Sequence, residues 1–287
     1  MAKPSSRSKA GSGRRSQSWD HGLSPVEQTL LIPLVARALG GELFPDRVCD
    51  DACALQVLER LGEDGRRYLT DPATVLNVLW RTGLIRHMAE QFFAQHPSAW
   101  GLNLGCGLTH YFQWLDNGEN TWIDADLPDV MALRKRLLPA QPPRLRARTV
   151  DLQSPGWWGR MRLPKRALEQ PVLVLCEGVL MYFDPEQVNA VLHEFAERAP
   201  AGSLLITDTV AGFVVGRAQW HASVGQTEAQ IHWGVDNLHS LSDVHPRLRL
   251  LDSHSVAPSH GWMGMAMEAF WRPWGGAPLY GLVLLGV

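Results

Sequence analysis

An apolar strand that runs directly into a glycine turn is the feature that most constrains this chain. Leu102-Asn103-Leu104-Gly105-Cys106-Gly107 follows Trp100-Gly101, a pattern that indicates a buried strand ending in a tight turn. Open α/β sheets place a nucleotide-like cofactor outside the carboxyl ends of their strands. Glycine suits such a turn because it tolerates positive φ and lets a ligand approach the backbone. The Gly-Cys-Gly triplet is a weak signal alone, so its meaning depends on the later strands.

Strand-like and helix-like segments alternate from Trp100 onward, which predicts a mostly parallel sheet. Seven strands are expected, at 100–104, 121–125, 145–150, 172–176, 203–207, 248–255 and 279–285. Helices are expected at 109–115, 128–138, 185–199 and 260–270. The last two strands are not joined by a clear right-handed crossover helix. We therefore predict a doubly wound α/β sheet with an antiparallel edge strand.

Three helices are predicted before the first strand, and we expect residues 24–97 to form an N-terminal helical lid over it. Pro25 to Leu39 has helical apolar spacing, and Ala52 to Leu61 forms a second, short helix. Asp71-Pro72 is typical of a helix start and opens a long helix that ends before Pro97.

The rest of the chain divides into a tail and one large domain. Residues 1–23 are basic and rich in serine and glycine, which predicts a disordered tail. Residues 98–287 are expected to form a cofactor-binding domain, and an insertion at about 210–245 is expected to build a wall of the substrate site.

Charge and cysteine content narrow the partners and the compartment. The formal net charge of −2 gives no general reason to expect nucleic acid or a membrane surface as partner. Cys49 and Cys53 have no second Cys/His pair of zinc-like spacing nearby, so no metal site is predicted. Reduced thiols and the lack of an export signal favour the cytoplasm.

Carboxylates follow the next predicted strands. Asp124 and Asp126 end the second strand, where a ribose needs an acidic acceptor, although Asp124 could instead cap the helix near Pro128. Asp151 ends the third strand and suits an adenine amino group. Glu177 follows five apolar residues, and burying it without a partner would cost several kcal/mol. We expect Glu177 to be hydrogen-bonded, the alternative being an exposed glutamate at a helix start.

The glycine turn departs from the dinucleotide fingerprint. In Gly105-x-Gly107-x-x-His110, a histidine stands where G-x-G-x-x-G has its third glycine. A bulky side chain there disfavours the close helix packing of nicotinamide enzymes. An oxidoreductase is therefore the least favoured alternative.

Together these residues resemble the leucine carboxyl methyltransferase family, including its bacterial branch of polyketide-type O-methyltransferases. The resemblance spans roughly 75–250 and is sharpest at Glu177–Phe183, close to the family's E-G-x-L-x-Y-L. It is also carried by Arg81-Thr82, Asn103–Leu108, Asp126–Val130 with Arg134, Asp151-Leu152, Thr207–Thr209 and Trp233-Gly234. The family implies S-adenosylmethionine as cofactor and a seven-stranded class I methyltransferase sheet.

The resemblance also implies roles for single residues. The cofactor-binding residues are Arg81, Gly105, Cys106, Gly107, Asp126, Asp151, Leu152 and Glu177. Arg81 would pair with the methionine carboxylate, Asp126 would hold the ribose, and Glu177 would face the methionine amino group or the donor end. The candidate substrate-binding residues are Tyr182, His232 and Trp233.

These expectations lead to one function and several alternatives. We expect an S-adenosylmethionine-dependent O-methyltransferase that acts on a carboxylate or hydroxyl of a small, polyketide-like metabolite. Thr109-His110-Tyr111 replaces the family's usual Asp-Thr-Arg, so a cofactor-binding regulatory or scaffold protein stays an alternative, as does a protein carboxyl methyltransferase. A hydroxyl acceptor would need a base, for which His110, His232 and Tyr182 are candidates, but no catalytic residue is assigned. Five tryptophans suggest a flat acceptor or simply core packing: Trp220, Trp233, Trp262, Trp271 and Trp274.

Overall fold

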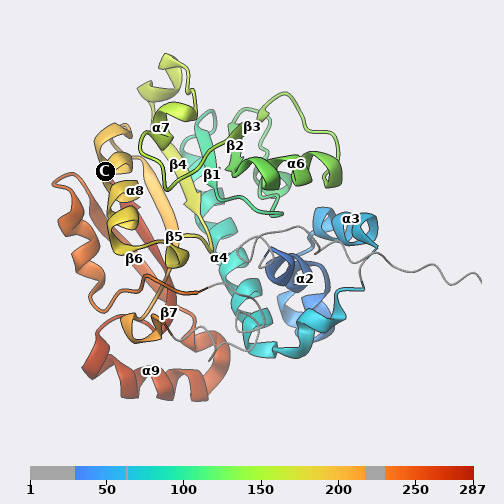
Figure 1. The fold of residues 1–287 in the computed structure, drawn as a ribbon, viewed down its shortest axis with the longest axis vertical. Coiled ribbons are helices and arrows are strands. Elements are labelled where there is room, and N and C mark those ends of the chain that lie inside the picture. The colour runs from blue at the N-terminus through green and yellow to red at the C-terminus, as the bar shows by residue number, and fades with distance from the viewer. Residues whose placement is uncertain (1–29, 63, 217–229) are drawn as a thin grey trace, which may run out of the picture.

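The chain folds around a single seven-stranded sheet with helices on both faces (Figure 1). A computed structural model describes residues 30–62, 64–216 and 230–287. The strands are β1 (Trp100–Leu104), β2 (Thr121–Asp126), β3 (Leu145–Thr149), β4 (Val172–Cys176), β5 (Leu204–Val210), β6 (Arg249–Ser255) and β7 (Tyr280–Gly286). They lie in the order β3-β2-β1-β4-β5-β7-β6, which confirms the predicted sheet. The predicted basic tail, residues 1–23, lies outside the described residues.

The sheet is parallel except at one side. Strands β1 to β5 pair in parallel, so that Leu102 lies opposite both Ile123 of β2 and Val174 of β4. Strand β7 is antiparallel and lies between β5 and the edge strand β6, with Ile206 opposite Leu284. The antiparallel pairing predicted at one side of the sheet is therefore present, with β7 as the reversed strand.

Alternate residues of the central strands face two separate hydrophobic clusters. On β4, Val172, Val174 and Cys176 pack on one face with helix α8 (Pro185–Arg198) and helix α7 (Trp157–Arg160). Leu173 and Leu175 point to the other face, which is covered by α4 (Pro72–Gln95) and α5 (Phe112–Leu115). Both faces of β4 are buried, which explains why its sequence is a continuous apolar run.

The helices after β1 largely follow the predictions. α6 spans Pro128–Leu137 and α9 spans Gly261–Gly275, whereas α7 was not predicted. The helix predicted at 109–115 was too long, because α5 begins only at Phe112. The carbonyl oxygens of Gly107 and Thr109 accept hydrogen bonds from Nη1 of Arg134, each at 2.7 Å, instead of from helical amides.

The N-terminal helices are joined to the sheet domain through one aspartate. α2 (Leu31–Leu39) and α3 (Ala52–Leu61) precede α4; residues 25–29 of the first predicted helix lie outside the described part. Asp51 caps α3 at the amide of Ala54 and accepts from Nε of Arg37, both at 2.8 Å. The side-chain amide of Gln113, on α5, donates to the same carboxylate at 2.8 Å. α2, α3 and α5 are thereby held together just beyond the glycine turn.

In the described part of the chain, no helix is both long and apolar enough to span a bilayer.

Candidate active site

A cavity of about 300 Å³ lies at the carboxyl ends of β1 to β4, where the strand order reverses. An open α/β sheet binds its ligands at this switch point. Each of these four strands contributes lining residues, and the start of the N-terminal layer contributes Leu30. The lining comprises Leu30, Gly105, Asp126, Leu127, Val130, Val150, Asp151, Leu152, Gln153, Gly178, Val179, Tyr182 and Phe183.

The glycine turn forms the floor of this cavity. Gly105 has a φ of +60°, and a Cβ there would lie 2.3 Å from Cγ2 of Val179. The amide of Gly107 donates to Oδ2 of Asp126 at 2.7 Å, and the amide of Leu127 donates to Oδ1 at 2.8 Å. Only glycine fits at position 105, and the two backbone amides hold the Asp126 carboxylate at the cavity wall.

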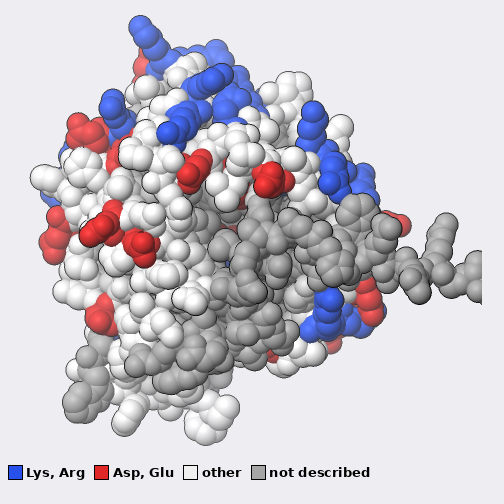
Figure 2. Space-filling view, in the orientation of Figure 1, with Lys and Arg blue, Asp and Glu red and all other residues white. Residues whose placement is uncertain are grey.

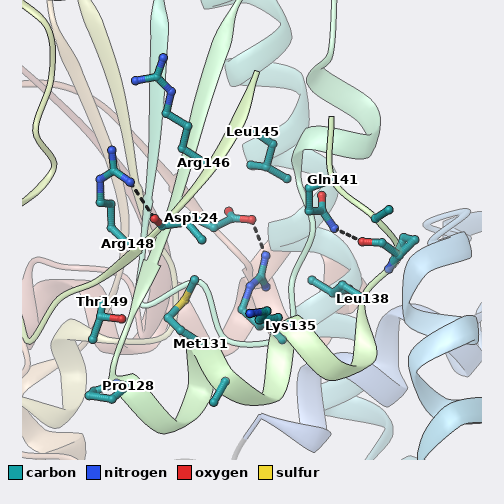
Figure 3. Close-up of a pocket in the computed structure, with 15 residues that line it drawn as sticks. Asp124, Pro128, Met131, Lys135, Leu138, Gln141, Leu145, Arg146, Arg148 and Thr149 are labelled. Carbon is teal, nitrogen blue, oxygen red and sulfur yellow. Dashed lines mark hydrogen bonds and ion pairs between the residues drawn. The ribbon is translucent and has the colours of Figure 1, made fainter. Parts of the chain in front are cut away.

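Asp124, the other candidate at the end of β2, has a different position. Its carboxylate accepts from Nδ2 of Asn103 at 3.2 Å, from Nε1 of Trp122 at 3.0 Å and from Nη2 of Arg134 (Figure 3). The interpretation of Asp124 as a helix cap is wrong, because no side chain caps the N-terminus of α6. Asp124 instead holds Arg134, whose Nη1 binds the carbonyls of the glycine turn. The ion pair of Asp124 and Arg134 therefore holds the backbone of the glycine turn in place.

Asp124 and Arg134 also line a second, open hollow between α6 and β3, drawn in Figure 3. This hollow measures about 580 Å³ and shares no lining residue with the cavity at the glycine turn. Arg146, Arg148 and Lys135 stand at its sides. Of the predicted carboxylate candidates only Asp124 lines it, whereas Gly105, Asp126 and Asp151 line the cavity at the glycine turn. We therefore place the functional site at the glycine turn.

A smaller cavity of about 100 Å³ adjoins the first and shares Gly178 and Tyr182 with it. Its other lining residues come from α2, α4, the turn after β4, β5, β7 and the segment after residue 229. Most are apolar, and Arg81 and Tyr280 supply polar atoms. They are Ile32, Pro33, Thr74, Asn77, Val78, Arg81, Met181, Val210, Ile231 and Tyr280.

A buried network surrounds Arg81 at the junction of the two cavities. Nε of Arg81 donates to Oε1 of Glu177 at 2.5 Å, and its Nη1 donates to the Tyr280 hydroxyl at 2.8 Å. Nη1 also lies 3.4 Å from Oδ2 of Asp208. The hydroxyls of Tyr111 and Tyr280 donate to Glu177 and Asp208, at 2.7 and 2.9 Å. Asp208 also accepts a hydrogen bond from the amide of Gly178 at 2.8 Å. This bond holds the backbone that follows Glu177 in place.

The network sets the charges of its members. Burial opposes ionisation of Glu177, but the charges of Arg81 and Arg37 and the Tyr111 hydrogen bond outweigh it and lower its pKa. Burial dominates at Asp208 and raises its pKa, although Arg81 and the Gly178 amide act against this. Burial also raises the pKa of Tyr280, which therefore keeps its proton at neutral pH. At neutral pH the network presents the charged pair of Arg81 and Glu177.

The predicted cofactor residues divide into three groups by location. Gly105, Asp126, Asp151 and Leu152 line the larger cavity, and Arg81 lines the smaller one. Glu177 and Gly107 lie behind the lining. Glu177 accepts a hydrogen bond from Arg81, and the amide of Gly107 donates one to Asp126. Cys106 is buried with its Sγ 3.8 Å from Sδ of Met131 in α6. Glu177 is only 6% exposed, so it is not an exposed glutamate at a helix start.

The predicted substrate residues are also separated. Tyr182 lines both cavities. The Trp233 side chain is buried in the core beside α8, and His232 is half exposed with Nδ1 3.6 Å from Oδ1 of Asp184. Neither residue lines a cavity; Ile231, the residue before His232, lines the smaller one. Residues 217–229 of the predicted insertion, with Trp220, lie outside the described residues.

Sequence reasoning missed three members of the network. Tyr111 belongs to the stretch that departs from the family pattern, and Tyr280 lies on the last strand. Asp208 matches the family pattern but received no role. A buried acidic residue in the apolar run of β5 was the available signal for Asp208, whereas no local signal distinguishes Tyr280.

The fold and this site together define a class I methyltransferase that uses S-adenosylmethionine. The model of the leucine carboxyl methyltransferase family matches residues 31–196, and the chain belongs to this family. The fold is similar to that of a Thermobifida fusca protein assigned as a methyltransferase, with a TM-score of 0.55 and 16% identity over 80% of this chain and 92% of that one.

Two sequence relatives match most of this chain. Tetracenomycin polyketide synthesis O-methyltransferase TcmP of Streptomyces glaucescens is 31% identical over 257 residues, which cover 86% of this chain and 92% of TcmP. The S-adenosyl-L-methionine-dependent methyltransferase dpfgK of Gibberella zeae is 25% identical over 84% of this chain and 88% of its own length. These relatives leave no support for the nicotinamide alternative.

Proposed function

We propose that this protein transfers a methyl group from S-adenosylmethionine to an oxygen atom of a small, largely apolar metabolite, with a carboxylate as the preferred acceptor. The observation that carries the proposal is the pair of cavities that meet at Gly178 and Tyr182. One has the character of an adenosine site and the other that of an apolar acceptor site, with a charged network at their junction. The kinship to TcmP, named as an O-methyltransferase of polyketide synthesis, supports a small-molecule acceptor.

The residues of the larger cavity fit the cofactor. Gly105 lines the cavity without a side chain, so a ligand can approach the backbone there. Asp126 offers a carboxylate to ribose hydroxyls, and Asp151 with Leu152 would enclose the adenine. When bound, the sulfonium supplies an activated methyl group.

The network at the junction suits the methionine end of the cofactor. Glu177 provides negative charge for the amino group and the sulfonium, and Arg81 provides a cation for the carboxylate. Methyl transfer is an in-line displacement, so the contribution of these residues is to orient the reactants and exclude water. α2 supports the proposed lid role, because Leu30, just before it, lines the larger cavity and Ile32 and Pro33 line the smaller one.

The described lining of the smaller cavity favours a carboxylate acceptor. A carboxylate is already ionised at neutral pH, whereas a hydroxyl would need a base. Tyr280 keeps its proton because burial raises its pKa, and it donates to Asp208. Of the three base candidates, His110 lines neither cavity and His232 faces Asp184, whereas Tyr182 lines both. A carboxylate would react here without a base, whereas a hydroxyl would depend on Tyr182.

Methyl transfer tests the proposal directly. The protein is incubated with tritium-labelled S-adenosylmethionine and matched pairs of aromatic carboxylic acids and phenols of the same ring system. We expect label in the acids, and we expect mild alkali to release it as volatile methanol because a methyl ester is cleaved and an aryl ether is not. Alkali-stable label in the phenols would overturn the choice of acceptor. Label only in a peptide C-terminus would instead support a protein carboxyl methyltransferase.

Cofactor binding separates a failed acceptor screen from a failed proposal. Calorimetry with S-adenosylhomocysteine should give micromolar binding to the wild-type chain and much weaker binding to Asp126→Ala. Glu119→Gln changes an exposed acidic residue far from the cavity lining and serves as the control. Binding without transfer to any acceptor would support a regulatory or scaffold protein, and no binding would overturn the cofactor site.

A further inference from the structure

Helix α9 carries an apolar surface that the described residues leave uncovered. Five large apolar side chains of this helix are more than half exposed: Trp262 (76%), Met263 (61%), Met265 (51%), Met267 (62%) and Phe270 (79%). Figure 2 shows uncharged side chains projecting at the lower end of the molecule, where α9 lies in Figure 1. Contiguous apolar patches on monomers rarely exceed a few hundred Å², and two aromatics and three methionines of this exposure approach roughly 600 Å².

The opposite side of α9 is fixed to the body of the protein. Glu268 is buried and accepts a hydrogen bond from the Ser255 hydroxyl at the end of β6. His260, at the start of the helix, lies 2.6 Å from Oδ1 of Asn77 on α4, and the Trp271 ring packs on Phe213 with centroids 4.4 Å apart. Because these contacts hold the inner side, α9 cannot rotate to bury its outer one.

The outer side has the spacing of a helix–helix interface. Trp262, Ala266 and Phe270 follow one another at four-residue steps and lie in one row along the helix. The row is symmetric about Ala266, since an aromatic residue lies four positions away on each side and a methionine lies one position away on each side. Trp262 and Phe270 are about 12 Å apart along the axis.

We propose that α9 pairs with α9 of a second copy of this chain, antiparallel, about a two-fold axis that passes beside Ala266. An isologous interface requires a surface that is complementary to itself under a two-fold rotation. Here each Trp262 meets the partner's Phe270, and the small Ala266 lets the two helices approach closely at the crossing. The apolar area of α9, roughly 600 Å² on each copy and so about 1,200 Å² in all, reaches the lower end of the size range of specific interfaces.

The charges of α9 favour a protein partner over a bilayer. Helices that lie in a membrane interface carry several Lys or Arg residues on the polar side. α9 has a single basic residue, Arg272, and its one acidic residue, Glu268, is on the buried side. Two copies can therefore approach without a cluster of like charges, and a single arginine gives the helix little attraction for anionic lipid.

The mass of the full chain in solution, measured by sedimentation velocity over a hundredfold concentration range, tests the pairing. We expect the wild-type protein to reach twice its 32.0 kDa at the higher concentrations. A266E and A266K each place like charges at the two-fold axis and should weaken dimerisation by at least about 100-fold. An equimolar mixture of the two variants should recover the dimer, because each glutamate then faces a lysine.

Controls make each outcome decisive. Leu55→Glu and Leu55→Lys change an exposed apolar residue on α3 and should leave the dimer intact. A wild-type chain that stays monomeric overturns the proposal, whether another segment of the chain or a bilayer covers α9. Flotation with phosphatidylcholine vesicles identifies the bilayer case. A dimer that tolerates A266E, or variants that stay monomeric when mixed although circular dichroism shows them folded, would overturn the two-fold pairing at Ala266.

Discussion

The guanidinium of Arg81 donates to Glu177 at 2.5 Å although the two residues are 96 positions apart in the chain. Arg81 lies on α4, before the first strand, and Glu177 follows β4. Their contact ties the N-terminal layer to the strand end at which the two cavities meet. It also helps to keep a buried carboxylate ionised: burial raises the pKa of Glu177, but the charges of Arg81 and Arg37 and the Tyr111 hydrogen bond together outweigh it and lower the pKa.

Glu177→Gln should therefore weaken cofactor binding. The amide keeps most of the side-chain volume but removes the charge that faces the amino group and sulfonium of the cofactor. Hydrogen bonds to charged groups contribute about 1.5–3 kcal/mol. We expect the affinity for S-adenosylhomocysteine, measured by calorimetry, to fall by about 10- to 100-fold. Glu169→Gln, an exposed change of the same chemistry, should leave it unaltered; equal affinities for Glu177→Gln and wild type would refute this role.

Gly105→Ala should abolish cofactor binding through sterics rather than through backbone conformation. Gly105 and Gly118 both have positive φ, +60° and +87°, so alanine is conformationally unfavourable at either position by about 1–2 kcal/mol. A Cβ at 105 meets Val179 at 2.3 Å, whereas a Cβ at 118 meets nothing within 4 Å. Only Gly105→Ala should lose calorimetric binding, and its melting temperature should fall further. Similar losses in both variants would assign the effect to the backbone alone.

Local sequence patterns were sufficient for the strands and for the residues that follow them. β4 is a continuous apolar run because both of its faces are buried, and Gly105, Asp126 and Asp151 lie at the ends of strands that meet at one edge of the sheet. Parallel strands bring their carboxyl ends together whatever their order. A one-dimensional pattern therefore locates this half of the site.

The other half of the site depends on tertiary contacts that no local pattern contains. Tyr280 reaches Arg81 only because β7 inserts between β5 and β6, a pairing set by the whole sheet. His232 and Trp233 were predicted to bind substrate because their side chains are polar and aromatic. Instead, their backbone amides donate to the carbonyl of Met181, and the neighbouring Ile231 lines the cavity. α5 is short because Arg134, from a later helix, takes the carbonyls of the turn.

Arg134→Met should destabilise the fold strongly. Arg134 and Asp124 are each only 4% exposed at their side chains, and removing the guanidinium leaves a buried carboxylate and two turn carbonyls without their donor. Breaking one partner of a buried pair costs about 3–5 kcal/mol. Urea unfolding should show a loss of this size. Arg86→Met removes an exposed ion pair with Glu90 on α4. Exposed pairs contribute at most about 1 kcal/mol, so the free energy of unfolding should change little.

The buried histidine after the glycine turn should make the fold less stable in mild acid. Burial lowers the pKa of His110 from its ordinary 6.5, with Asp124 acting against this, and its Nδ1 has no hydrogen-bond partner among the described residues. As the pH falls below 6.5, the unfolded chain takes up a proton that the folded chain does not, so the free energy of unfolding decreases. His110→Gln removes this proton uptake, and its urea-unfolding free energy should fall less than that of wild type between about pH 7 and pH 5. His87→Gln alters a solvent-exposed histidine on α4 and should keep the wild-type slope, whereas an unchanged slope in His110→Gln would show that another group causes the acid sensitivity.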